Sequence, residues 1–148
     1  AKDDEFSSAD TNIALFKNEL AEIATERGIS VSYAVINTAF SQDKTVHEQL
    51  MGKLIDELEE GSQLIADITY GPKDLPIIEF TALSFSEKFL GCEIENILYG
   101  QSSFADGVAV NTKICDMAPL FYLGSITDTV HADTPDKARR MLKSLLSL

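Results

Sequence analysis

The sequence predicts an α+β fold, on the basis of two periodicities and their order along the chain. Apolar residues recur every three or four positions near both ends, which is typical of amphipathic helices. In the middle of the chain they alternate every second residue, which is typical of strands. We therefore expect a single domain over residues 1–148, with two N-terminal helices, one C-terminal helix and a mostly antiparallel sheet of about five or six strands.

The first helix is predicted to follow a polar, flexible arm over residues 1–8. Asp10 or Thr11 can cap its start, and Gly28 stands where a left-handed residue commonly ends a helix. One apolar stripe runs along it: Ile13, Phe16, Leu20, Ile23 and Ala24.

A strand and a second helix are expected next. Residues 29–40 change to a period of two, with small and β-branched residues, as in a strand buried on one face. Thr45 and Glu48 then have the spacing of a capping box, which predicts a helix that ends at Gly61.

From Ser62 onward the pattern is mostly that of strands. Residues 64–70 and 77–85 are expected to form a hairpin, because Pro76 can begin a strand without losing a needed hydrogen bond. Ser84 and Glu87 have the spacing of a capping box and could instead begin a short helix over residues 85–90. The sequence therefore does not decide between helix and strand for residues 85–98. Three more strands are expected, over residues 91–99, 107–115 and 120–131.

The last element should be a helix that begins at Pro135, with Asp133 or Thr134 as its cap. Its apolar residues recur at helical spacing and should face the core. They are Ala138, Met141, Leu142, Leu145 and Leu146.

Two cysteines, Cys92 and Cys115, are the only ones in the chain, and both fall in predicted strands. A disulfide between them would place the protein outside the reducing cytosol, in the periplasm or secreted. The alternative is that both are small buried apolar residues. The start at Ala1 is one that signal cleavage leaves, as does trimming of a recombinant chain.

The formal net charge of −12 is carried by residues 1–100, with 19 acidic and 7 basic side chains, whereas residues 101–148 carry five of each. This charge argues against nucleic acid and anionic membranes as partners, and it favours a protein partner with a basic surface. Four carboxylates crowd the end of the second predicted helix, where the helix dipole opposes them. These predicted partner-binding residues are Asp56, Glu57, Glu59 and Glu60.

No motif for a nucleophile, a phosphate-binding loop or a zinc site occurs, so no catalytic residue, metal site or cofactor is predicted. The weak exception is His131, which could act with Asp128 and Asp133 as a metal ligand or base. His47 falls in the first turn of a predicted helix, where the dipole disfavours an imidazolium. Seven aromatic residues could line an apolar pocket, although such residues more often form a core: Phe80, Phe85, Phe89, Tyr99, Phe104, Phe121 and Tyr122.

The function expected from these observations is non-enzymatic. We expect an acidic interaction domain that binds a protein partner, of the immunity, inhibitor or regulatory-subunit type. The alternative is a small-ligand-binding or sensory domain with an apolar pocket between the sheet and the helices. An enzyme built around His131 ranks third.

Overall fold

The computed structural model describes residues 3–147, with side chains described from residue 12 onward. It divides the chain into two compact units, residues 1–35 and 36–148, which are taken separately below. The α+β class is confirmed, but the predicted architecture is wrong. The described residues form five α-helices and a sheet of three strands, where three helices and five or six strands were expected.

The first unit is built on helix α1 (Asp3–Arg27). It begins before both predicted caps, Asp10 and Thr11, and it takes in most of the predicted arm; residues 1 and 2 lie outside the described part. Gly28 ends it with a φ of +65°, as the sequence predicts, because glycine adopts a left-handed conformation without a steric penalty.

The strand predicted over residues 29–40 does not form in the described structure. Its alternating side chains are largely exposed, with Ile29 57% and Val35 50% accessible. A strand needs a neighbouring backbone to pair with, and no ladder reaches this segment within residues 3–147. The Tyr33 hydroxyl instead donates to the carbonyl of Lys17, 3.2 Å away, and so fastens the segment to α1.

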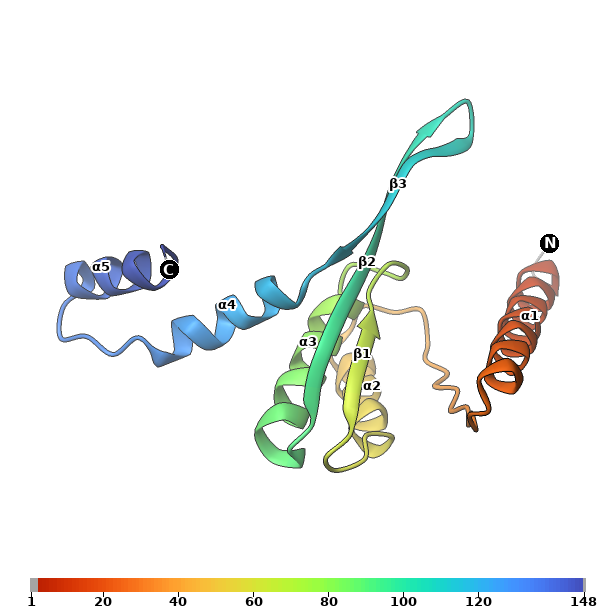
Figure 1. Cartoon of the computed structure of the whole chain (residues 1–148), viewed down its shortest axis with the longest axis horizontal. Helices are drawn as coiled ribbons and strands as arrows, with labels where there is room; N and C mark the ends of the chain where they lie inside the picture. The colour runs from red at the N-terminus through yellow and green to blue at the C-terminus, as the bar shows by residue number, and fades with distance from the viewer. Residues whose placement is uncertain (1–2, 148) are drawn as a thin grey trace. The chain divides into compact units, whose positions relative to one another are not determined.

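The second unit holds the sheet, in the order β1-β2-β3. Strand β1 pairs parallel to β2, and β2 pairs antiparallel to β3, so the predicted mostly antiparallel sheet is corrected to a mixed one (Figure 1). Its elements are α2 (Lys44–Asp56), β1 (Gln63–Asp67), α3 (Leu75–Phe85), a π-helical turn (Ser86–Leu90), β2 (Glu93–Ala105), β3 (Val108–Asp116), α4 (Ala118–Thr129) and α5 (Pro135–Leu145).

The predicted strand over residues 77–85 is helix α3. A short apolar run fits a buried helix as well as a buried strand, so its period does not separate them. The parallel pairing of β1 with β2 favours the helix, because two parallel strands need a long crossover connection, which is usually a helix. Pro76 lies in the first turn of this helix, where its missing N–H costs nothing. Residues 85–98 resolve into the π-helical turn and the start of β2.

The predicted strand over residues 120–131 is also a helix, α4. Asp116, the last residue of β3, stabilises the start of α4. Its Oδ1 accepts hydrogen bonds from the backbone N–H of Ala118 at 3.0 Å and of Ile97 at 3.2 Å. These bonds lower the pKa of the Asp116 carboxyl. Pro119 then occupies the first turn.

Strands β2 and β3 form a hairpin that continues past the end of β1, whose pairing stops where Asp67 meets Leu98 (Figure 1). The turn is Asp106-Gly107, and both residues have positive φ, 51° and 78°. A two-residue turn in which both residues have positive φ has a backbone twist that matches the right-handed twist of the flanking strands. Residues 100–103, which lie between the predicted strands 91–99 and 107–115, belong to β2.

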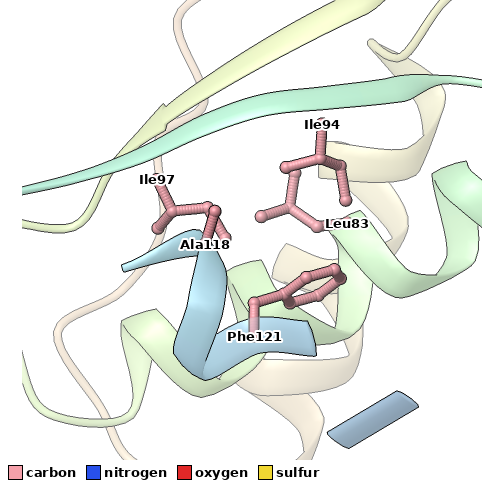
Figure 2. Close-up of a cluster of buried hydrophobic side chains, with 5 residues drawn as sticks. All are labelled: Leu83, Ile94, Ile97, Ala118 and Phe121. Carbon is pink, nitrogen blue, oxygen red and sulfur yellow. The ribbon is translucent and has the colours of Figure 1, made fainter. Parts of the chain in front are cut away.

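The core of the second unit lies between the sheet and helices α3 and α4. Figure 2 shows Leu83, Ile94, Ile97, Ala118 and Phe121 directed toward one another. Ile94 and Ile97 are three residues apart and still share a face, because Glu95 is an extra residue in the pairing of β2 with β1. Ile97 is 0% exposed.

The ends of two helices differ in detail from the prediction. Helix α2 is capped by Asp43, whose Oδ1 accepts from the N–H of Val46 at 3.0 Å, and not by Thr45. Helix α5 has the predicted Thr134 cap, but none of its residues is buried. The expected packing of Met141, Leu142 and Leu145 is therefore absent from the described structure, with only Leu142 half-buried.

The predicted disulfide does not form: Cys92 and Cys115 are both free. The register of the hairpin separates them, because Cys115 pairs with Tyr99, seven residues along β2 from Cys92. Seven residues of strand span roughly 23 Å, far beyond the Cα separation that a disulfide allows. The buried Cys92 donates instead to the carbonyl of Glu59 at 3.3 Å. No helix in residues 3–147 has the length and apolar character needed to cross a membrane.

Candidate functional site

The predicted partner-binding carboxylates lie at the end of α2 and in the turn after it. Only Asp56 is within the helix; Glu57 is its C-cap, and Glu59 and Glu60 follow. All four residues are exposed. The helix therefore ends before the predicted Gly61, so the dipole opposes fewer of these charges than expected.

The three residues of the weak His131 site are not brought together. His131 is exposed, Asp128 lies 3.8 Å from the ammonium of Lys88, and Asp133 lies 3.3 Å from that of Lys137. Within the described part of the chain, no group of three or more His, Cys, Asp or Glu side chains could hold a metal ion.

The aromatic residues mostly pack with one another. Phe80 meets Phe121 edge-on with ring centroids 5.5 Å apart, and Phe121 meets Tyr122 in the same way at 5.3 Å. Phe104 lies on the hairpin and is 73% exposed. Phe80 and Phe121 also line an open hollow of about 360 Å³ between α3 and α4. Two further cavities in the second unit have no aromatic residue of this predicted set in their lining.

The first cavity, which we call the α2–α3 cavity, has a volume of about 170 Å³ and opens between the first turns of these helices. Residues 38–42 of the preceding segment form one wall. The buried side chains of Leu50 and Ile78 line the cavity between the two helices, and the apolar side chains of Val46 and Leu75 line it as well.

A histidine–aspartate pair lies in the wall of this cavity. The Nε2 of His47, in the first turn of α2, is 2.5 Å from Oδ2 of Asp74, the residue before α3. Their side chains are 32% and 22% exposed. Gln42 also points its Nε2 to Oδ1 of Asp74, at 3.5 Å. Two half-buried polar groups thus converge on an otherwise apolar hollow, which is the usual composition of a small-molecule site.

Ser41 lines the same cavity, which places serine, histidine and aspartate together. A nucleophilic triad needs the hydroxyl to be bonded to the imidazole. The Ser41 hydroxyl instead donates to Oδ2 of Asp43 at 2.6 Å. This bond and the Val46 N–H lower the pKa of Asp43. The arrangement therefore suits binding better than acyl transfer.

The second cavity, the Glu79 cavity, has a volume of about 210 Å³ and lies between α2, β1 and α3. Its lining is apolar apart from the carboxyl groups of Asp67 and Glu79. Oε2 of Glu79 is buried and has no hydrogen-bond partner within residues 3–147. Burial, and to a smaller extent the nearby Asp67 carboxylate, raises the pKa of Glu79 to about 7.

Sequence reasoning missed Glu79 because it assigned residues 77–85 to a strand, and it missed Asp74 because it placed that residue in the turn of the predicted hairpin. With the helix known, a signal is visible: Glu79 is the only charged residue of α3, and it stands on the stripe of Leu75, Ile78, Ala82 and Leu83. An acid on the inward stripe of an apolar helix indicates either a buried ion pair or a binding group. His47 was noticed in the sequence, but its partner was not.

Comparison with known proteins does not assign this chain to a family. No protein-family model matches the sequence, and no curated protein matches it either.

Proposed function

We propose that this chain is a small-ligand-binding domain and that its ligand occupies the α2–α3 cavity. The observation that carries the proposal is the His47–Asp74 pair in the wall of an apolar hollow of about 170 Å³. Apolar walls supply affinity through burial, and a few convergent polar groups supply orientation and specificity.

The size of the cavity limits the ligand to about one ring. An apolar cavity of about 150 Å³ is known to hold benzene. The polar pair calls for a hydroxyl group, which can donate to the Asp74 carboxylate or accept from the His47 imidazole. A one-ring molecule with one hydroxyl group is therefore the ligand class that fits.

Phenol is the probe that tests this proposal. In an NMR titration we expect phenol to bind with a Kd of about 0.1–1 mM, which is the range open to so small a ligand. The shifted amide signals should be those of residues 38–50 and 74–78. Toluene has the same ring and no hydroxyl group, and we expect it to bind less tightly.

Two substitutions separate binding from a purely structural role of the pair. Asp74→Asn keeps the shape but removes the charge, so phenol should bind about tenfold more weakly and toluene about as before. Val46→Phe should fill the cavity and abolish the binding of both phenol and toluene. Asp136→Asn, at an exposed carboxylate, is the matched control. If Asp74→Asn weakened the binding of phenol and of toluene equally, the His47–Asp74 pair would only hold the two helices together.

Binding of a protein partner through the acidic residues after α2 is the second candidate function. It is supported by the exposure of Asp56, Glu57, Glu59 and Glu60 and by the net charge of −12. Clustered exposed charge of one sign accelerates association with a partner of the opposite sign. Export to the periplasm or outside the cell stays a prediction, without a disulfide to support it.

Charge reversal tests the second candidate. With Glu57→Lys and Glu60→Lys together, a basic partner isolated by pull-down should associate more slowly, and its rate should depend less on ionic strength. The control is Glu48→Lys, a charge reversal within α2 and away from the acidic residues that follow the helix. An unchanged rate and salt dependence in the double variant would place the partner elsewhere.

A further inference from the structure

The placement of Glu79 runs against the ordinary pattern of an amphipathic helix. Helix α3 has a single charged residue, and that residue faces the Glu79 cavity. Two positions earlier, Ile77 is 68% exposed. A helix selected for packing alone would place the acid outward and the isoleucine inward. The inward carboxyl therefore calls for a compensating contact.

The described residues do not supply that contact. Oε2 of Glu79 is buried and accepts no hydrogen bond within residues 3–147. A buried acceptor without a partner is costly, so native proteins leave few of them. The other titratable group lining the cavity is Asp67, on β1, whose negative charge makes the site less favourable still for an ionised Glu79. The lining residues of α2 are Leu54 and Leu58, which carry no charge.

The ionised carboxylate of Glu79 needs a donor as its partner, and a cation is the donor that satisfies the site best. An ammonium group would donate to Oε2 and would also offset the charges of both carboxylates. The rest of the ligand must be apolar, because the other lining residues are mostly aliphatic: Leu54, Leu58, Leu64, Ala66, Ala82 and Leu83. A volume of about 210 Å³ leaves room for one ring or a short chain.

We propose that the Glu79 cavity binds a small organic ammonium ion, with its apolar body between α2 and α3 and its ammonium group on Oε2 of Glu79. This site is separate from the α2–α3 cavity and does not depend on the function proposed there.

Benzylammonium is the probe, used with the full chain in NMR titrations at pH 6 and pH 8. Its amine stays protonated at both values, as a lysine side chain does. Glu79, whose pKa is raised to about 7, is mostly protonated at pH 6 and mostly ionised at pH 8. The ionised fraction of Glu79 rises about tenfold between these values, so we expect binding about tenfold tighter at pH 8, with shifts at Leu54, Leu58 and Ala82.

Variants and a neutral analogue decide the outcome. Glu79→Gln should weaken benzylammonium binding at least tenfold at pH 8 and remove its pH dependence, whereas Glu48→Gln on the surface should change neither. Ala66→Leu should fill the cavity and abolish binding. The proposal is overturned if Glu79→Gln binds as tightly as the native chain, if benzyl alcohol binds as tightly as benzylammonium at pH 8, or if binding survives Ala66→Leu.

Discussion

Ile97→Ala is expected to lower the free energy of unfolding by about 2–5 kcal/mol, the range for truncating a large buried aliphatic side chain. Ile97 is 0% exposed and packs in the core beside Leu83 and Phe121 (Figure 2). Its backbone N–H donates to Asp116 and its carbonyl accepts from Met117 at 2.6 Å; alanine keeps both bonds. The loss therefore reports burial of the side chain.

The measurement is urea unfolding followed by circular dichroism, with Ile114→Ala as the matched control. Ile114 is also a strand isoleucine, but it is 76% exposed, so we expect a change of about 0.5 kcal/mol or less. Any shared effect of replacing a β-branched residue in a strand appears in both variants. Equal destabilisation of the two variants would contradict the core described for the second unit.

Glu79→Gln is expected to stabilise the protein at pH 8 and to change its stability little at pH 5. Burial raises the pKa of Glu79 from 4.5 to about 7. Between these values the folded chain holds a proton that the unfolded chain releases. Stability therefore falls as the pH rises through this window and stays low above it. Glutamine has no proton to lose and avoids this cost.

The size of the effect should be about 1–2 kcal/mol, because solvent around a half-buried group screens much of the penalty that the pKa alone would imply. The measurement is the difference in unfolding free energy between Glu79→Gln and the native chain at pH 5 and pH 8. Taking this difference cancels the contribution of groups that do not interact with Glu79. A difference that does not grow between pH 5 and pH 8 would mean that Glu79 is solvated.

The sequence predicts three of the five helices, and the two strands on either side of Asp106-Gly107, better than it predicts the sheet. The hairpin that it predicts, between residues 64–70 and 77–85, is wrong, and the observed hairpin joins β2 to β3. Helices α1, α2 and α5 have clear apolar stripes and nearby caps, and Asp106-Gly107 is a strong turn signal. Residues 77–85 and 120–131 were wrongly assigned because a continuous apolar run has no period to separate helix from strand. The proline in the first turn of each helix, Pro76 and Pro119, is the signal that favours the helix.

The candidate site depends on contacts that the sequence does not state. His47 and Asp74 are 27 residues apart, and only the packing of α2 against α3 brings them together. Glu79 becomes conspicuous only after its segment is known to be a helix. The disulfide prediction failed for the same reason, since the register of β2 with β3 decides which strand residues meet.

Intermolecular NOEs from bound phenol show directly whether a small ligand occupies the α2–α3 cavity. We expect NOEs from the ring protons to the methyl groups of Val46, Leu50 and Ile78, which line the cavity. At saturating phenol, the absence of NOEs to all three side chains, or their replacement by NOEs to exposed residues of the hairpin, would contradict the proposed occupancy of this cavity.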